Sequence, residues 1–505
     1  MKLFNQAVWW FLLLGLSLRC GSLNRPLLDA HLLRQTQTAD ATRSLIAQPG
    51  FPLSARIPWQ GDLDTRYVQE PPIYNYLAIA LYKLGLSLDL AGKLVSLGLW
   101  GLSFVLLQGL WRRCLPPAAV SWANLLFVIG PLEVFYGQAF MPEMLIQCLS
   151  LGFLLGALRY FENPTARRWL VCAATGLLAV LLKLPATLHL WLLIAFLLVQ
   201  QEGWKAALRL RYVLTAILCA ALMLAWSRYV EAVNAPNLSE WTPHNSLLLF
   251  LGTPLDRLKY KLWAVLGLYL VVFVVPGVAA VVAVVGLSAG RRQSCCRFLF
   301  LWLGSLAIFY LLWFGNTGAR QGYYNLVAVG PLCGLFGVGV SALLNLERLR
   351  SRPAFWRAAI ACAVIACAIP GTLYLFRQDR QLYEAARWTR DHVPQGEVVL
   401  FRPNHRFDML DYPQNAVMAY YSEHPTFLWA GQTSEPLRQA ALNRARYALV
   451  TLPTAPPQGL LGLFRRFRGD TARPVDSLAW LGTNGFRLDF VKTNSFALYR
   501  KTPPL

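Results

Sequence analysis

The segment Leu23–Tyr76 reads LNRPLLDAHLLRQTQTADATRSLIAQPGFPLSARIPWQGDLDTRYVQEPPIYNY and lies near the start of a 505-residue chain. It follows a first apolar run and precedes a long series of further apolar runs. Acidic, basic and amide side chains are interspersed in it with Leu, Ile, Trp and Tyr. A simple connection between two hydrophobic helices does not need that density of charged groups, so we expect this segment to carry chemistry.

The composition is that of a polytopic membrane protein. Hydrophobic residues make up 56% of the chain, charged residues only 14%, and the mean hydropathy is +0.42. The net charge of +22 would suit a nucleic-acid-binding protein, but the basic residues punctuate apolar runs instead of forming one patch. We therefore interpret the positive charge as a topology signal.

The apolar runs predict a mainly α-helical bundle with about eleven spans of about 20 residues each. The first, residues 7–18, is short enough for a signal peptide, but no small-residue cleavage site follows it, so we expect an uncleaved helix. Either interpretation puts Leu23 outside the cytoplasm. The other spans are expected near 91–110, 118–137, 142–158, 169–183, 186–200, 212–230, 262–286, 297–314, 323–343 and 357–376.

Lys and Arg concentrate in one alternating set of short loops, and the positive-inside rule makes that set cytoplasmic. The outer face then holds the first loop 23–90, the corner 138–142, the loops 231–261 and 315–322, and the C-terminal region. This predicts a multi-pass protein of a bacterial inner membrane whose candidate active-site residues all face the extracytoplasmic side. The cytoplasmic set comprises Arg112, Arg113, Arg159, Arg167, Arg168, Lys205, Arg209, Arg211, Arg291, Arg292, Arg297, Arg348, Arg350, Arg352 and Arg357.

The sequence predicts two domains, a membrane domain over 1–376 and a small extracytoplasmic α/β domain over 377–505. Long apolar runs stop after Phe376. Two short runs, 396–401 and 446–452, are typical of buried strands, and 435–445 is typical of a helix between them. The final segments FRLDFV and FALYR predict a hairpin.

Candidate chemical groups begin with Asp29-Ala-His31, followed by Arg34-Gln35. A carboxylate beside a developing nucleophile can act as a general base, and a guanidinium suits phosphate oxygens. The alternative is an interfacial loop whose charges simply face water. The same choice applies to Glu70 and Tyr74 in the QEPPIY motif, where Glu70 is either a carboxylate aimed by the prolines or an ordinary acid at a helix start.

Later corners on the predicted outer face supply further candidates. Glu143 follows Met-Pro and is either a helix-terminal acid or a second functional carboxylate. Lys183 interrupts an apolar stretch, where a cation is costly unless it snorkels or meets an anion such as a phosphate. Arg320 precedes Tyr323 and Tyr324, two tyrosines that an aromatic belt alone could explain.

The sequence points to no bound cofactor. It contains neither a P-loop nor a GxGxxG turn in a βαβ setting, and no Cys pair has zinc-like spacing. Asp62 and Asp64 could offer oxygens to a hard cation, but two acids in a loop are weak evidence for a metal site.

Five motifs together resemble the GT-C fold glycosyltransferases, and within them family 39, which includes protein mannosyltransferases and the aminoarabinose transferase that acts on lipid A. The motifs are RQTQTA at 34–39, EPPIY at 70–74, MPE at 141–143, LKLP at 182–185 and the tyrosine pair at 323–324. They occur in the expected order on one predicted side of the membrane, and the resemblance covers roughly residues 1–340.

The resemblance implies transfer of a sugar, with inversion, from a polyprenyl-phosphate donor to a lipid, surface-glycan or protein acceptor. The acid pair that family members commonly carry early in the first loop falls here on Arg34-Gln35. The catalytic carboxylate is therefore expected to be Asp29, with Glu70 and Glu143 as alternatives. Arg34, Lys183 and Arg320 are expected to bind the donor phosphate, and His31, Gln35, Tyr74, Tyr323 and Tyr324 to line the substrate site.

Three other functions fit parts of the pattern. A transporter or flippase of lipid-linked glycans would show inverted repeats and charges near the midplane, and we find no repeat. A membrane-anchored binding protein would leave the first-loop residues unexplained. A glycan ligase or polymerase of the same fold would differ only in using a larger glycan as donor.

Overall fold

The computed structural model describes residues 6–62, 66–235, 257–312, 321–378, 380–402, 413–428, 435–451, 486–492 and 496–501. The chain divides into two compact units. The first unit is Met1–Asn24, Leu90–Tyr229 and Pro243–Phe376, and the second is Arg25–Asp89, Val230–Thr242 and Arg377–Leu505. The domain boundary expected after Phe376 coincides with a unit boundary, but the first loop groups with the C-terminal region, not with the helices.

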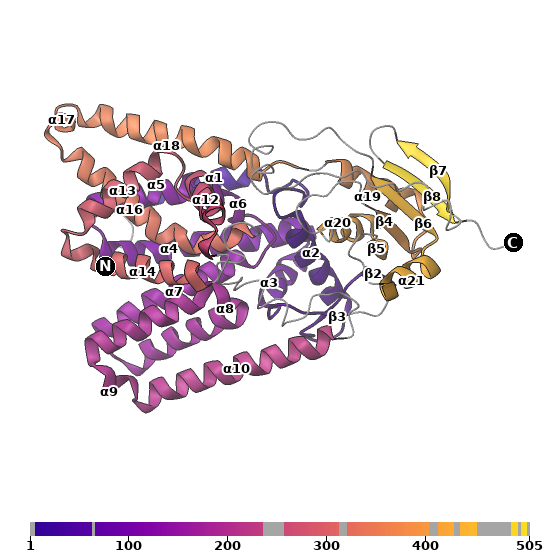
Figure 1. The fold of residues 1–505 in the computed structure, drawn as a ribbon, viewed down its shortest axis with the longest axis horizontal. Coiled ribbons are helices and arrows are strands. Elements are labelled where there is room, and N and C mark those ends of the chain that lie inside the picture. Colours follow the sequence, from indigo (N-terminus) through magenta and orange to yellow (C-terminus); the bar gives the residue numbers. More distant parts are fainter. Residues whose placement is uncertain are drawn as a thin grey trace. The chain divides into compact units, whose positions relative to one another are not determined.

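The first unit is a bundle of apolar helices (Figure 1). Among the described residues, seven helices are long and apolar enough to cross a membrane, or eight if one sharply bent pair counts as a single span. This establishes a multi-pass helical fold but does not confirm about eleven spans. The helices are α1 (Gln6–Cys20), α4 (Leu88–Cys114), α5 (Pro117–Ile129), α6 (Pro131–Tyr136), α7 (Glu143–Glu162), α8 (Ala166–Glu202), α9 (Trp204–Ala207), α10 (Leu210–Asn234), α12 (Tyr260–Tyr269), α13 (Val278–Gly290), α14 (Arg297–Leu312), α16 (Leu326–Leu344), α17 (Glu347–Arg350) and α18 (Pro353–Leu375).

Two predicted spans are broken. The expected span 118–137 divides into α5 and α6 at Gly130, whose φ/ψ of −57° and 129° is not helical and precedes a proline. The expected span 262–286 divides into α12 and α13, which are bent by 101°. A π-helical turn, Leu270–Val274, and then Pro276 and Gly277 interrupt it, and Gly277 has a φ of +50°.

Helix α8 consists of two arms that fold back on each other at Lys183. Its backbone there is extended, with φ −161° and ψ 84°, and Pro185 lacks a backbone N–H. A Cβ atom on Gly176 would lie 2.8 Å from the ring of Trp191, which a continuous helix would place about 22 Å away along its axis. The two short predicted runs on either side of Lys183 are therefore antiparallel neighbours.

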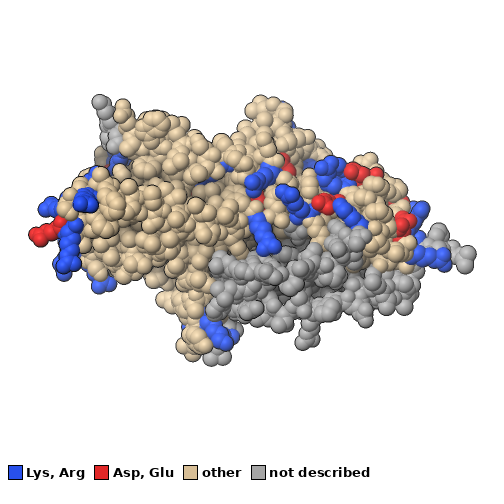
Figure 2. Space-filling model, turned by 90° about the horizontal axis from the view of Figure 1, so that it is seen from above, with Lys and Arg blue, Asp and Glu red and all other residues tan. Residues whose placement is uncertain are grey.

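The surface of this unit follows the predicted charge pattern. Figure 2 shows a broad face without charged side chains and a group of Lys and Arg at the end of the unit. Exposed basic side chains flank the ends of α13, α14, α16 and α18, and include Arg291, Arg292, Arg348 and Arg350. This arrangement is that of a membrane domain whose loops carry the charge.

The second unit contains a six-stranded mixed sheet in the order β2-β5-β4-β6-β8-β7. The predicted strands, helix and terminal hairpin are confirmed as β4 (Val399–Arg402), β6 (Tyr447–Thr451), α21 (Glu435–Arg444), β7 (Phe486–Lys492) and β8 (Phe496–Lys501). Strand β2 (Trp59–Asp62) comes from the first loop and pairs with β5 (Thr426–Leu428). The remaining elements are α2 (Leu32–Ala47), β1 (Ala55–Arg56), β3 (Arg66–Tyr67), α3 (Ile73–Tyr82), α19 (Arg380–His392) and α20 (Pro413–Ser422).

The first loop and the C-terminal region share one core. Leu28, which precedes α2, packs among buried residues of α19, α20 and the sheet, including Phe401 and Leu449. Helix α2 runs against α20, and Arg43 of α2 donates a 2.8 Å hydrogen bond to the carbonyl oxygen of Tyr420. The apolar residues that intersperse the first loop thus attach it to the sheet.

Candidate functional site

Lys183 and Glu143 form a buried ion pair inside the helical unit. The ammonium nitrogen of Lys183 lies 2.8 Å from Oε1 and 3.0 Å from Oε2 of Glu143, and the two side chains are 7% and 4% exposed. Glu143 is the first residue of α7, and Lys183 stands at the break of α8. The break releases Lys183 from helical geometry and lets its side chain reach the start of α7.

Two aromatic rings complete the surroundings of this lysine. The Lys183 nitrogen lies 4.1 Å from the ring centre of Tyr323 and 4.6 Å from that of Tyr324. Both tyrosines are buried in the 3-10 turn Gly322–Asn325. The negative faces of the rings stabilise the cation in addition to the carboxylate.

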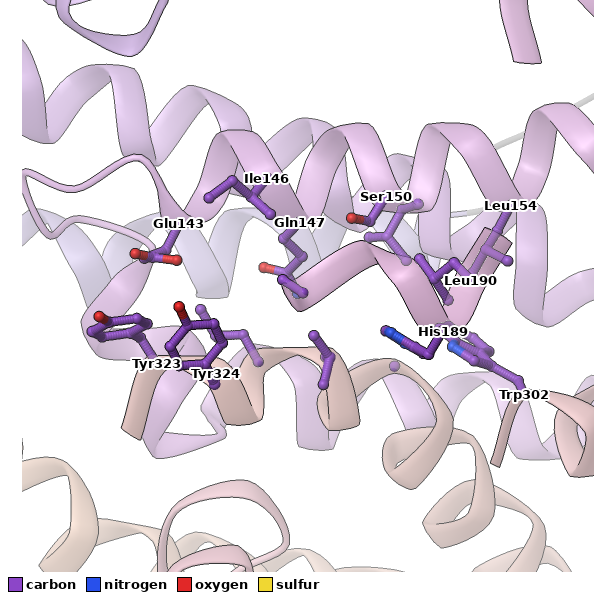
Figure 3. A pocket seen from close by; sticks show the side chains of 15 residues that line it. Glu143, Ile146, Gln147, Ser150, Leu154, His189, Leu190, Trp302, Tyr323 and Tyr324 are labelled. Carbon is purple, nitrogen blue, oxygen red and sulfur yellow. The ribbon is translucent and has the colours of Figure 1, made fainter. Parts of the chain in front are cut away.

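Glu143 of this ion pair lines one end of a cavity between α7, α8, α14 and α16, whose empty volume, including space open to solvent, is about 540 Å³. Figure 3 shows Glu143, Tyr323 and Tyr324 at that end and His189 and Trp302 farther along. Leu, Ile, Val and Ala side chains supply much of the lining between them. The cavity therefore combines one charged end with a largely apolar wall that also carries Gln147, Ser150 and His189.

Among the lining residues that the sequence-based site missed, four carry polar atoms: Gln147, Ser150, His189 and Trp302. Gln147 lies one helical turn after Glu143, and His189 lies six residues after Lys183, each in an apolar span. A histidine inside a span is uncommon and was a usable signal. Nothing in the sequence singled out Trp302 among the 18 tryptophans.

A second group of candidate residues lies in the other unit, around Arg34. Its guanidinium makes short contacts to the Glu70 carboxylate and the Gln69 side-chain oxygen, and a 3.4 Å hydrogen bond to Gln37. The side chains of Arg34 and Glu70 are 11% and 14% exposed. The residue expected to bind phosphate and a residue expected to act as base are thus paired with each other.

The other first-loop candidates sit where α2 begins. The Asp29 side chain is buried, and His31 adopts the left-handed conformation (φ 55°, ψ 34°) just before the helix. A left-handed backbone is uncommon for a residue with a side chain. Gln35 donates a 3.1 Å hydrogen bond to the carbonyl oxygen of Ala30, which fixes this turn. Tyr74 is 1% exposed and belongs to the packed face of α3.

Arg320, the third predicted phosphate ligand, lies outside the described residues, as do Leu63 and Asp64. Among the side chains that the structure does describe, no cluster of three or more His, Cys, Asp or Glu residues could hold a metal ion. The helical unit therefore brings together Glu143, Lys183, Tyr323 and Tyr324, and the second unit brings together Arg34 and Glu70.

Comparison with known proteins gives a clear result for structure and none for sequence. No model of a protein family matches the chain, and no curated protein matches it. The structure is similar to the crystal structure of ArnT from Cupriavidus metallidurans in the apo state, with a TM-score of 0.59 and 14% identity over 97% of both chains.

A second similar structure is the arabinofuranosyltransferase AftD from Mycobacteria, with a TM-score of 0.51 and 15% identity. That match covers 98% of this chain and 39% of AftD. A mutant form of AftD, R1389S, matches with the same TM-score and 14% identity. The likeness to ArnT spans helices and sheet alike, and the chain has the GT-C fold that its motifs predicted.

Proposed function

We propose that this protein is a GT-C membrane glycosyltransferase that takes a sugar from a polyprenyl-phosphate carrier and transfers it, with inversion, to a lipid, surface-glycan or protein acceptor. The observation that carries the proposal is the buried Lys183–Glu143 pair, whose Glu143 lines the end of a largely apolar cavity. A polyprenyl phosphate has the matching character, because an anionic head is joined to a long hydrocarbon chain.

Energetics argues against a purely structural role for the ion pair. Burying two charges costs several kcal/mol per ion, and well-packed apolar residues usually stabilise a protein as well or better. A buried cation beside a membrane-embedded cavity is most simply explained by an anionic ligand. In the unliganded protein Glu143 neutralises Lys183, and an incoming phosphate competes with Glu143 for that lysine.

The reaction is a single displacement. The acceptor hydroxyl oxygen bonds to the anomeric carbon while the bond from that carbon to the phosphate oxygen breaks, and the bonding electron pair leaves on the phosphate. Lys183 and Arg320 stabilise this departing charge. The acceptor proton passes to a carboxylate, for which Asp29 remains our first candidate and Glu70 and Glu143 are the alternatives.

Phosphate as the leaving group already activates the sugar, so the scheme needs no nucleotide and no redox cofactor. His31, Gln35 and Tyr74 are the candidates for substrate contacts from the first loop, and Tyr323 and Tyr324 from the helical unit. The charge pattern of the loops supports an extracytoplasmic active site in a bacterial inner membrane.

One observation favours a second candidate, a flippase of lipid-linked glycans. Spans broken at Gly130, Lys183 and Pro276 are a feature of transporters, in which unwound backbone lines the substrate site. The same cavity could then hold a lipid phosphate without cleaving it.

The deciding experiment incubates the purified protein with a panel of polyprenyl-phosphate sugars and measures free polyprenyl phosphate. We expect acceptor-dependent release from one donor, which also identifies the sugar. Lys183→Met should abolish release at low donor concentration. Lys93→Met is the matched control, because it removes another buried lysine of the bundle, whose ammonium donates to the carbonyl oxygen of Ser22, whereas Lys183 pairs with the cavity-lining Glu143. Release from no donor by folded protein would leave the flippase or a ligase of larger glycans.

A further inference from the structure

A stack of three aromatic rings lies on the surface of the second unit. The ring of Trp388 on α19 lies between His392, whose ring centre is 4.2 Å away at an interplanar angle of 8°, and Phe490 of β7, at 4.5 Å and 15°. Nδ1 of His392 donates a 2.9 Å hydrogen bond to the carbonyl oxygen of Trp388, which fixes the imidazole. His392 is exposed and Phe490 is 37% exposed. Both faces of Trp388 are covered, so the two outer rings present the flat surface of the stack.

Two arginines on neighbouring strands face each other beside this stack. Arg487 of β7 and Arg500 of β8 are directly paired in the antiparallel register. Phe490 pairs with Leu498, which lies two residues before Arg500 and packs in the core under α19. Side chains two residues apart on a strand share a face, so the arginines lie on the face of the stack, about 7 Å along the sheet from it.

The protein itself does not neutralise this pair of arginines. Other basic side chains of the α19 and sheet surface have acidic partners, namely Lys492 with Glu384 at 2.6 Å, Arg446 with Glu397 at 2.9 Å and Arg390 with Asp391 at 3.1 Å. Among the residues that the structure describes, no carboxylate pairs with Arg487 or Arg500, and Asp489, an acid on the same strand β7, forms no ion pair with either. The Arg500 guanidinium instead faces the ring of Tyr447, at 5.9 Å.

Direct opposition of two arginines has a cost that simple solvation does not explain. Single exposed arginines are common and need no ligand. Like charges directly opposite each other on a sheet are destabilising, however, and Arg487 and Arg500 are in that position. An anionic ligand that binds both side chains would remove the repulsion.

The combination of flat rings and unneutralised arginines selects the ligand. The guanidinium fork matches the two oxygens of a carboxylate or a phosphate. The C–H face of a sugar ring is flat and weakly positive, which suits the negative face of an aromatic ring. A spacing of about 7 Å between rings and arginines lets neighbouring sugars of one chain contact both. An anionic membrane surface would need exposed cations and inserted apolar side chains, but not a stack of parallel rings.

We propose that His392, Phe490, Arg487 and Arg500 form a binding site for an acidic glycan, a sugar chain that carries carboxylate or phosphate groups. None of these four residues belongs to the candidate catalytic groups, and all lie in the second unit. The inference rests on the proposed function only where it makes this glycan the acceptor. It then selects a negatively charged surface glycan among the possible acceptors.

The test measures the binding of two acidic probes to the full-length protein in a nonionic detergent. Oligogalacturonate carries carboxylates, phosphorylated maltooligosaccharide carries phosphates, and plain maltooligosaccharide of the same length is the neutral reference. We expect at least one acidic probe to bind, more weakly as the salt concentration rises, and the neutral chain not to bind. The tighter acidic probe identifies the anionic group.

Arg487→Gln and Arg500→Gln should each weaken binding of that probe about tenfold, as the loss of one hydrogen bond to a charged group implies. The unfolding temperature of either variant should stay the same or rise, because the repulsion is removed. Arg387→Gln is the matched control and should bind as the wild type does. Arg387 is another exposed arginine of α19, but its guanidinium faces the ring of Tyr383, which packs against Tyr421 of α20.

Equal binding of acidic and neutral chains would overturn the inference, as would acidic binding that survives both arginine substitutions. Binding to phosphatidylglycerol vesicles but to neither acidic probe would also overturn it and assign the surface to the membrane. The outcome is separate from that of the proposed function, because no transfer reaction is measured. Glycan binding by a protein that releases no polyprenyl phosphate would uphold this site and contradict the transferase, and release without glycan binding would do the reverse.

Discussion

The two oxygens of Glu143 lie 2.8 and 3.0 Å from the ammonium nitrogen of Lys183, and under the proposed function the donor phosphate takes the place of this carboxylate. The relationship makes Glu143 a competitor of the donor as well as the counter-ion of the lysine. Donor binding and the release of Glu143 are then one event.

Glu143→Gln should therefore bind polyprenyl phosphate more tightly than the wild type. It removes the competing charge and leaves Lys183 without a counter-ion until the ligand arrives. The same substitution should lower the unfolding temperature of the unliganded protein, because breaking a buried pair costs about 3–5 kcal/mol. Ligand binding and thermal unfolding, measured on the same preparation, check both effects.

The double variant Lys183→Met with Glu143→Gln supplies the control for stability. Without either charge it should unfold near the wild-type temperature and bind no donor. Lys183→Met alone should weaken donor affinity more than it slows turnover at saturating donor. Unchanged donor affinity in the variants that lack Lys183 would rule out its phosphate role.

Asp29→Asn should abolish sugar transfer and leave expression and donor binding largely intact. The substitution keeps the size of the side chain and removes the proton acceptor. Single-turnover transfer, measured beside donor affinity, separates the two effects. Asp40→Asn is a suitable control because Asp40 is also buried in this unit, where it pairs with Arg43 at 3.1 Å. Full activity of Asp29→Asn would move the base to Glu70 or Glu143.

Structural features set by neighbouring residues could be predicted from the sequence, whereas features set by contacts between distant parts of the chain could not. Local patterns identified the helices, the strands β4 and β6 and the terminal hairpin, because periodicity and turn residues act over a few positions. Local patterns also flagged Lys183 and Glu143, since charges stand out in apolar runs. Their pairing was not predictable, because it depends on the fold-back of α8.

The breaks and the shared core show where local patterns fail. Gly130 and Pro276 lie inside runs apolar enough to count as single spans, and hydropathy does not register a change of direction. The pairing of Gln60 in the first loop with Phe427 is a contact between distant parts of the chain. The two strands are far apart in the sequence, so no turn signal between them could predict their pairing.

The alkaline stability of the second unit should depend on Tyr420 and Tyr421. Their hydroxyl groups donate to the two carboxylate oxygens of Asp89, at 2.5 and 3.2 Å. Burial, with a contribution from the Asp89 charge, raises the pKa of both tyrosines well above the ordinary value of 10. The native state thus resists losing these protons, whereas the unfolded chain releases them near pH 10.

Stability from these tyrosines is therefore complete below about pH 10 and is lost as the pH rises further, by up to about 1.4 kcal/mol per pH unit for each group. Tyr421→Phe should lower stability at neutral pH and make unfolding less steeply dependent on pH above 10. Denaturant unfolding at a series of pH values checks this. Tyr499→Phe serves for comparison, because burial raises the pKa of Tyr499 without an acidic partner. An unchanged pH slope in Tyr421→Phe would contradict the linkage.

Close packing of α13 against α16 should make Gly339 intolerant of any side chain. A Cβ atom there would lie 2.0 Å from the carbonyl oxygen of Val282, and one on Gly286 would lie 2.0 Å from that of Leu335. Backbone cannot move aside as a flexible side chain can, so Gly339→Ala must separate the two helices. We expect a loss of about 1–3 kcal/mol and a lower yield of monodisperse protein in detergent.

Gly98→Ala on α4 is the control. The added Cβ atom meets nothing within 4 Å, so the substitution should be neutral or slightly stabilising, because alanine favours the helix. Equal thermal stability of the two variants would mean that α13 and α16 do not pack at this distance.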